Sequence, residues 1–349
     1  MWIYYTIFAL TTLLGYLANK YNKANRKITR FILYVVLSIF VVFVGLRDVT
    51  VGSDSTNYAY YLESAKEMNL TLFLILHSTD IVFYTFTWLC SRLFSVNMYF
   101  FILAALYFAV FLKFIYNRSS NIGLSIWLVN SIGFTTFALS TLRQSVAIAF
   151  CLLAYMYFSR KRLWAFVYML IACLCHVSAI IFMPILFIDK ISGKKLPLLM
   201  TSILFFVLAF SSSIMNYLSS TLKDERYEMV EVGGLGMIIF LSFIIIVGLL
   251  VNNNKTIPRD YQFGLFAIFL ALCSFILTRF NMAAMRAYYY YLAIIVIFIP
   301  DTYMCLSKRY KAVYLVSIIF ITFFFLVYRV MSDPYEDSRL LLPYKLFWQ

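Results

Sequence analysis

The chain has 349 residues, of which 64% are hydrophobic, 20% aromatic and only 13% charged. Soluble domains carry about 25% charged residues, so this composition, with a mean hydropathy of +0.88, excludes an ordinary soluble protein. The formal net charge is +14. In a membrane protein, however, the side on which basic residues lie matters more than their sum, so we expect no nucleic-acid partner.

Long apolar runs recur along the chain, for example "FILYVVLSIFVVFVGL" and "FLSFIIIVGLLV". Helical runs of about 17–25 residues match the bilayer core. The sequence therefore predicts an all-α, polytopic helical membrane protein that forms a single integral membrane domain over residues 1–349. The first run lacks a charged leading segment and a cleavage site, so we expect a span and not a signal peptide. About ten spans are expected, near residues 3–18, 31–46, 97–115, 121–138, 142–158, 197–216, 235–251, 261–278, 287–306 and 312–330.

Two further apolar segments fit this path only if each enters and leaves on one side. We expect residues 71–95 to be a re-entrant or interfacial piece on the outer side. Residues 163–188 are expected to dip in from the cytoplasm as a helical hairpin with His176 near its tip. Non-helical backbone at that depth is tolerated only where it lines a cavity. If either segment is a plain span, some basic loops change sides.

Basic residues set the orientation, because short loops rich in Lys and Arg stay cytoplasmic. Clusters of such residues lie at 20–30, 113–118, 160–162, 190–195, 255–259 and 308–311. With all of them inside, external loops are expected near 47–70, 217–234 and 331–349. The polar residues that this path brings to the outer side are Arg47, Asp54, Tyr58, Arg143, Gln144, His176, Arg226, Arg279 and Arg286. The positive-inside rule disfavours arginines there, so another interaction must retain them.

The first polar interruption is "GLRDVTVGSDSTNYAYY". Its glycines permit a chain reversal, and Asp54 or Ser55 can cap a following helix. Asp54 and Tyr58 then stand one turn apart on one face. The alternative is a solvated loop in which Asp54 is only a cap. Arg47 sits where an apolar span ends, and its alternative is a side chain that snorkels to the headgroups.

The next polar group is in "LSTLRQSVAIAF", where Arg143 and Gln144 open a span. A helix N-terminus favours an anion, and an arginine fork beside free N–H groups is a good receptor for phosphate oxygens. A snorkelling arginine is the competing interpretation. In "ACLCHVSAII", His176 is flanked by apolar residues. It is either a packed side chain with a local partner or part of a site, since ionisable groups within membranes usually mark one. No metal-ligand spacing accompanies it, so we expect no metal.

Two later stretches complete the polar set. The loop "SSTLKDERYEMVEVGGLG" is the most charged external one, and a solvated loop accounts for most of its charges. In "TRFNMAAMRAYYYYLAIIVIFIP", Arg279 and Arg286 are two helical turns apart and precede four tyrosines. Interfacial tyrosines are common, whereas external arginines are not. Arginines around an external cavity fit a dianionic ligand such as a lipid diphosphate. No Walker loop, dinucleotide fingerprint, serine elbow or HExxH motif is present.

The motifs, taken in order, resemble those of the EpsG-like, Wzy-type bacterial polysaccharide polymerases. "GLRDVTVGSDSTNYAYY" resembles the family's opening signature, and "LRQSVAIAF", "CHVSAIIF", "RYEMVEVGG" and "RAYYYYLAIIVIFIP" resemble its later motifs. The closing "LLPYKLF" resembles its C-terminal ending, so the similarity covers about residues 40–347. The first motif departs from the family pattern at Asp48–Thr50 and Ser53, but keeps the Asp54–Tyr58 spacing.

The resemblance implies a GT-C-like integral glycosyltransferase. Such a protein polymerises undecaprenyl-diphosphate-linked oligosaccharide repeats of an O-antigen or exopolysaccharide at the outer face of the bacterial cytoplasmic membrane. Donor and acceptor are both lipid-linked, so we expect no cofactor. The implied partners are these glycans, membrane lipid and a protein that regulates chain length.

In this mechanism, arginines stabilise the charge that develops on the departing lipid diphosphate, and a base activates the acceptor hydroxyl. The expected catalytic residues are Asp54, Arg47, Arg143, Arg286 and His176, with Asp54 preferred to His176 as base. The expected substrate-binding residues are Tyr58, Gln144, Arg226, Tyr227, Arg279 and Tyr289. Alternatives are a ligase that transfers finished glycan, and a transporter or flippase. A transporter predicts paired broken helices and charges at mid-bilayer. A purely structural scaffold does not explain the external arginines.

Overall fold

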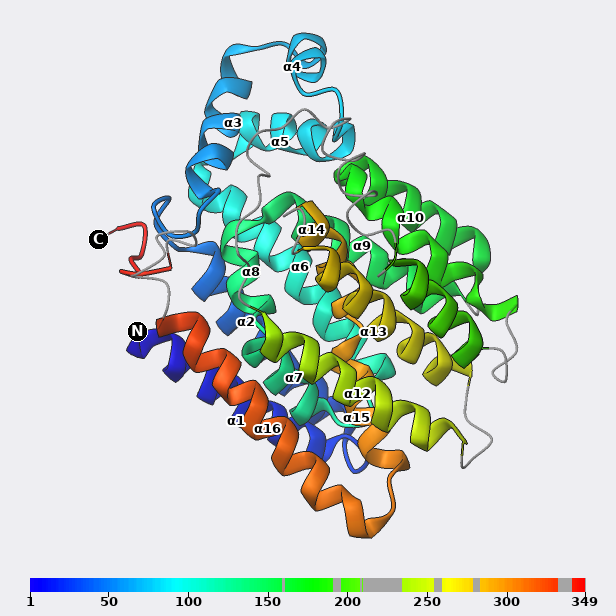
Figure 1. Cartoon of the computed structure of the whole chain (residues 1–349). Helices are drawn as coiled ribbons and strands as arrows, with labels where there is room; N and C mark the ends of the chain where they lie inside the picture. The colour runs from blue at the N-terminus through cyan, green and yellow to red at the C-terminus, as the bar shows by residue number, and fades with distance from the viewer. Residues whose placement is uncertain are drawn as a thin grey trace. The chain divides into compact units, whose positions relative to one another are not determined.

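A computed structural model describes residues 1–158, 161–190, 196–207, 209, 234–253, 259–278, 283–331 and 341–348. These residues are helical almost throughout (Figure 1), and the only β-type pairing among them is an isolated bridge between Arg47 and Leu346. The helices are α1 (Trp2–Tyr21), α2 (Arg26–Gly45), α3 (Ser55–Glu67), α4 (Leu70–Leu76), α5 (Ile81–Leu93), α6 (Val96–Arg118), α7 (Ile122–Ser131), α8 (Phe134–Ser140), α9 (Leu142–Phe158), α10 (Arg162–Cys175), the 3-10 helix η1 (Val177–Lys190), an unlabelled apolar helix (Leu196–Val207), α12 (Leu235–Asn253), α13 (Arg259–Leu277), α14 (Ala283–Leu292), α15 (Ile295–Cys305) and α16 (Lys308–Met331).

Several of these helices are long and apolar enough to cross a membrane. Four described helices meet this condition alone, and up to six spans result if each of two bent pairs counts as one. The four are Arg26–Gly45, Val96–Arg118, Asp260–Leu277 and Lys308–Met331; the bent pairs are Ile122–Ser131 with Phe134–Ser140, and Ala284–Leu292 with Ile295–Cys305. The predicted class, an all-α polytopic membrane protein, is confirmed. Other predicted spans, such as 142–158 and 235–251, are shorter apolar helices of 10–17 residues, and the total of ten stays a prediction.

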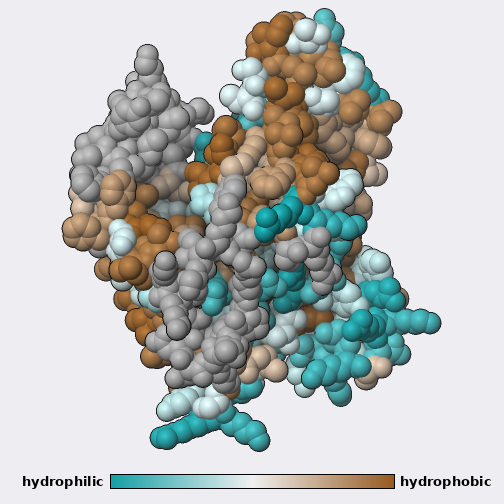
Figure 2. Space-filling model, turned by 90° about the vertical axis from the view of Figure 1, so that its right-hand side faces the viewer, coloured by the Kyte–Doolittle hydropathy of each residue, from teal (hydrophilic) through white to brown (hydrophobic). Residues whose placement is uncertain are grey.

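The surface of these helices suits a lipid environment. Only 28% of the apolar window of α16 is buried within the protein. Its exposed side chains include Val316, Phe320 and Phe324. Hydrophobic residues also cover much of the described surface on the face drawn in Figure 2. Because water penalises such exposure, these faces are expected to contact acyl chains.

The chain divides into two compact units. The first comprises Met1–Ile180 and Ala312–Gln349, and the second comprises Ile181–Lys311. A single integral domain therefore stays a prediction. Within the first unit, α9 packs against α6 and α10, while α5 packs against α3, α4 and α10.

The helices α3, α4 and α5 lie together at one end of the first unit (Figure 1). They have 13, 7 and 13 residues, too few to cross a bilayer that requires about 20. None of these helices spans a bilayer by itself, and the placement of residues 71–95 as a re-entrant or interfacial piece stays a prediction. Asn69 caps α4 by accepting a hydrogen bond from the backbone N–H of Leu72, which fixes the turn before it.

The helical structure is interrupted at His176. The helix α10 ends at Cys175, and His176 has an extended backbone with φ −159° and ψ 118°. The chain then continues as the 3-10 helix η1, which contains Pro184. Since a proline removes a backbone donor, α-helical geometry is disfavoured there. The break leaves His176 at the end of a helix instead of in its middle.

A second break separates α7 from α8, which are inclined by 45°. Gly133 at the bend has φ +96°, a left-handed conformation that glycine adopts readily. The buried side chain of Asn130 donates to Thr11 Oγ1 and accepts from Thr135 Oγ1, each at 2.9 Å. These bonds satisfy polar groups at the bend. The bend leads the chain through α8 directly into the start of α9.

Residues 341–348 close onto the end of α2. The Tyr344 hydroxyl donates to the carbonyl of Phe43 at 2.6 Å. The N–H of Asp48 donates to the carbonyl of Lys345 at 2.9 Å, and the N–H of Phe347 donates to the carbonyl of Leu46 at 3.1 Å. This C-terminal segment therefore supports the loop that follows α2.

Candidate functional site

Arg47, in the loop after α2, is completely buried. Its Nε donates to the carbonyl of Val51 at 3.1 Å, and its Nη1 donates to the carbonyl of Val44. Its Nη2 donates to Ser55 Oγ at 3.0 Å and to the carbonyl of Leu139 at 2.9 Å. Burial lowers the pKa of Arg47 to about 10, so the guanidinium stays charged at neutral pH. These partners all belong to the protein and support the loop after α2, while the contact of Arg47 with a leaving group stays a prediction.

The loop that Arg47 anchors lies tightly against the end of α8. Gly52 has φ +96°, and a Cβ atom there would overlap the carbonyl of Leu139. The N–H of Ser53 donates to Ser140 Oγ at 3.3 Å. Only glycine combines this conformation with this approach. The loop after α2 therefore packs against the end of α8, close to the first residues of α3 and α9.

Asp54 is the N-cap residue of α3, as its position predicted, although its side chain makes no capping hydrogen bond. Its backbone carbonyl accepts from the N–H of Tyr58 at 3.1 Å. Tyr58 is buried, and its hydroxyl accepts from the backbone N–H of Arg143 at 3.3 Å. Tyr58 therefore links α3 to the first turn of α9.

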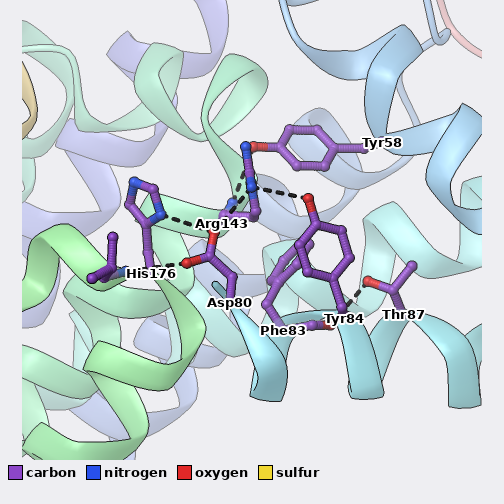
Figure 3. Close-up of polar contacts among 8 residues, drawn as sticks. Tyr58, Asp80, Phe83, Tyr84, Thr87, Arg143 and His176 are labelled. Carbon is purple, nitrogen blue, oxygen red and sulfur yellow. Dashed lines mark hydrogen bonds and ion pairs between the residues drawn. The ribbon is translucent and has the colours of Figure 1, made fainter. Parts of the chain in front are cut away.

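Asp80, the N-cap residue of α5, joins three elements at one carboxylate (Figure 3). Its Oδ2 accepts from Nη1 of Arg143 at 2.9 Å and lies 3.1 Å from Nδ1 of His176. Its Oδ1 accepts from the N–H of Val177 at 3.1 Å. The same Nη1 of Arg143 donates to the Tyr84 hydroxyl at 3.0 Å. We call this group of side chains the carboxylate cluster; it consists of Asp80, Tyr84, Arg143 and His176.

The carboxylate cluster keeps Asp80 ionised. Burial by itself would raise the pKa of the Asp80 carboxyl, since it removes the charged form from water. The hydrogen bond and charge of His176, the charge of Arg143 and the N–H of Val177 outweigh burial, and the pKa is lowered. Only 2% of the Asp80 side chain is exposed, so at neutral pH this is a paired, buried anion.

Arg143 has a partly exposed side chain and one buried donor without a partner among the described residues. Its Nε is buried and has no hydrogen-bond partner among the described residues. Its side chain is 27% exposed, against 2% for Asp80. Buried donors in native proteins nearly always have a partner, and an arginine fork suits phosphate oxygens. Arg143 therefore has the properties of an anion receptor. The neighbouring Gln144 is buried.

Aromatic rings pack around Tyr84 of the carboxylate cluster. The ring of His77 stacks on Tyr84 at 4.1 Å between centroids, and Tyr61 and Phe73 contact both rings edge-on. Burial, and then the charge of Arg143, lower the pKa of His77. A neutral His77 avoids repulsion with Arg143, so the packing fixes Tyr84 without adding charge.

The other predicted residues fall elsewhere. Arg286 and Tyr289 are on α14 of the second unit, where Arg286 is exposed and Tyr289 half-buried. Arg226, Tyr227 and Arg279 lie outside the described residues. The structure thus brings together Tyr58, Arg143 and His176, while the roles of the others stay predictions. Among described residues, no group of three or more His, Cys, Asp or Glu side chains is arranged to hold a metal.

Asp80 and Tyr84 were not predicted as site residues from the sequence. Asp80 precedes an apolar helix in "HSTDIVFYTF", where aspartate is an ordinary N-cap. The available signal was a carboxylate inside the segment already predicted as a re-entrant or interfacial piece, since such a charge requires a partner.

The fold and the carboxylate cluster define a polytopic membrane protein with an arginine–carboxylate–histidine site at the junction of α5, α9 and α10. The sequence model of the EpsG family matches residues 30–346, and the chain belongs to this family. Membership indicates a membrane polysaccharide polymerase of the glycosyltransferase type, which confirms the predicted resemblance. No curated protein and no solved structure matches the chain.

Proposed function

We propose that this protein polymerises oligosaccharide repeats carried on undecaprenyl diphosphate, at the outer face of a bacterial cytoplasmic membrane. The observation that carries the proposal is Arg143. This arginine is paired with Asp80, yet has a buried Nε without a partner among the described residues, and shares its carboxylate with His176.

The reaction joins two lipid-linked glycans. A hydroxyl at the non-reducing end of one repeat attacks the anomeric carbon of the growing glycan. The bond from that carbon to the lipid diphosphate breaks, and its electron pair goes to the diphosphate oxygen. Charge therefore develops on the leaving group, and Arg143 stabilises it more strongly in the transition state than in the bound substrate.

In this proposal His176 takes precedence over Asp54 as the base. His176 lies 3.1 Å from the carboxylate that also binds Arg143, so base and anion receptor share one anchor. Asp54 has its place at the start of α3, where its carbonyl holds Tyr58. In the proposed reaction His176 accepts the proton of the acceptor hydroxyl, and Tyr58 orients the start of α9.

The basic loops support the orientation. Their lysines and arginines favour the cytoplasm, which turns the loop after α2 and the start of α9 outward. Both substrates then reach the site from the outer leaflet, and no nucleotide sugar is needed. A protein that controls chain length is the expected partner.

The test uses purified protein in vesicles with lipid-linked repeats as the sole substrate. A polymerase lengthens them into a ladder of glycans, whereas a ligase or flippase leaves single repeats. Arg143→Lys keeps the charge but loses the planar fork, and we expect at least about a hundredfold slower lengthening, typical of a lost electrostatic donor. Arg309→Lys, at an exposed position of α16, is the matched control and should give the normal ladder. A normal ladder from Arg143→Lys would remove the assignment.

A further inference from the structure

The carboxylate cluster contains an unassigned group, the Asp80 carboxylate. It belongs to α5, yet contacts both the side chain of His176 and the backbone N–H of the next residue, Val177. His176 also ends α10, where its N–H donates to the carbonyl of Ala172 at 2.9 Å and its carbonyl accepts from Ala179 at 2.9 Å. Ring and backbone of His176 are therefore both fixed.

The hydrogen bonds that Asp80 accepts determine which ring nitrogen of His176 carries the hydrogen. An ionised carboxylate only accepts hydrogen bonds. The nitrogen that faces it, Nδ1 of His176 at 3.1 Å, must therefore carry hydrogen. In a neutral imidazole the other nitrogen, Nε2, then bears the lone pair. Figure 3 shows Nδ1 directed at Asp80 and the second ring nitrogen turned away from it. No hydrogen bond to Nε2 is found within the described part of the chain.

We propose that Asp80 is a positioning residue that holds His176 in the tautomer with hydrogen on Nδ1, so that Nε2 is the base of the polymerase. The inference rests on the proposed function and deepens it. As the acceptor oxygen bonds to the anomeric carbon, its proton moves to Nε2. The lipid diphosphate leaves with the electron pair of the broken bond. The imidazolium formed is stabilised by the Asp80 carboxylate until the proton passes to water.

The shared carboxylate also explains why receptor and base do not repel each other. Arg143 is cationic throughout, and His176 becomes cationic during the reaction. Like charges destabilise each other in a buried site, but Oδ2 of Asp80 contacts both groups, at 2.9 and 3.1 Å. A simple structural ion pair would need only Arg143 and Asp80. The additional contact to Nδ1 has the geometry of an imidazole-orienting carboxylate.

The chain offers a direct spectroscopic test, because it contains only two histidines. Nitrogen-15 labelling of histidine gives two imidazole spin systems in detergent, and a His77→Gln variant assigns them. In mildly alkaline buffer, His176 should show a protonated Nδ1 and an unprotonated Nε2. In Asp80→Asn, the amide oxygen is expected to keep accepting from the N–H of Val177. The amide NH₂, which is a donor, then faces Nδ1 of His176. The hydrogen of His176 should then move to Nε2.

Activity is measured on the same variants. Asp80→Asn should lower kcat for chain lengthening by about a hundredfold or more, the usual range for a lost general base, with KM changed less than about threefold. Asp48→Asn is the matched control, since Asp48 bonds to Thr50 and lies outside the carboxylate cluster. It should change neither tautomer nor kcat.

Hydrogen on Nε2 in the wild-type protein would overturn the inference, as would a tautomer change in Asp80→Asn without loss of kcat. The tautomer measurement needs no substrate, so it judges the Asp80–His176 couple separately. Failure of the wild-type protein to lengthen lipid-linked repeats overturns the proposed function instead. If Asp80→Asn does not fold, His176→Gln tests the base: unchanged kcat contradicts the inference, and loss of kcat with intact thermal stability supports it.

Discussion

The guanidinium of Arg47 donates a hydrogen bond across 2.9 Å to the carbonyl of Leu139, a residue 92 positions later. This contact ties the loop after α2 to the end of α8, one turn before Arg143 enters the carboxylate cluster. The two arginines that looked alike in the sequence therefore differ in their partners. Arg47 donates mainly to backbone carbonyls, whereas Arg143 pairs with the Asp80 carboxylate and has an Nε without a partner in the described part of the chain.

Arg47→Met should destabilise the protein. The substitution removes the guanidinium donor from the carbonyls of Val44, Val51 and Leu139. The single hydroxyl hydrogen of Ser55 can serve only one of the last two, and each buried carbonyl left without a donor costs about 1–3 kcal/mol. A fall in the thermal unfolding midpoint in detergent measures it. Arg143→Lys is the comparison, expected to retain the midpoint while losing activity. An Arg47→Met protein with normal stability and no activity would favour the predicted catalytic role of Arg47 at the leaving group.

Gly52→Ala should displace the loop after α2. The new Cβ combines a left-handed backbone with overlap of the Leu139 carbonyl, and strain of this kind costs about 1–3 kcal/mol. Thermal unfolding and the glycan ladder are both expected to suffer. The neighbouring substitution Ser53→Ala, which removes the hydroxyl of a half-buried residue, is the control. Equal stability of the two variants would contradict the described loop geometry.

The stability of the protein should depend on the ionisation of Asp80. Because its pKa is lowered in the folded state, its stabilisation is complete above the unfolded pKa of about 3.9. That contribution is lost as pH falls through the lower folded pKa. Thermal midpoints of wild type and Asp80→Asn should therefore differ most above about pH 4 and converge in stronger acid. A constant difference across this range would mean that the carboxylate is not the source.

Tyr84→Phe should weaken the anion receptor without unfolding the protein. The hydroxyl accepts from Nη1 of Arg143 at 3.0 Å, and a hydrogen bond to a charged group is worth about 1.5–3 kcal/mol. We expect kcat/KM for lipid-linked repeats to fall roughly tenfold to a hundredfold. Tyr60→Phe, whose ring is 69% exposed, should leave it unchanged. Equal rates for both variants would remove Tyr84 from the site.

The sequence predicted those features that depend on local composition. Apolar length predicted the membrane class, and polar interruptions predicted Tyr58, Arg143 and His176, which the structure brings together. It could not predict what depends on distant partners. Asp80 acquires its meaning from Arg143, 63 residues later, and from His176, 96 residues later. The structural partners of Arg47 could not be predicted either, because the pattern of its own segment gives no hint of the Leu139 carbonyl.

The C-terminal segment has a consequence for biogenesis. Tyr344 bonds to Phe43 across 301 positions of the chain. Ribosomes add about 5–20 residues per second, so the end of α2 waits on the order of 15–60 s for this neighbour. During translation α1 and α2 can be inserted into the membrane while the loop after α2 still lacks its contacts with residues 341–348. The contacts of the loop after α2 are thus completed only after residues 341–348 emerge, and a nascent chain stalled before them should be sensitive to protease at residues 48–54.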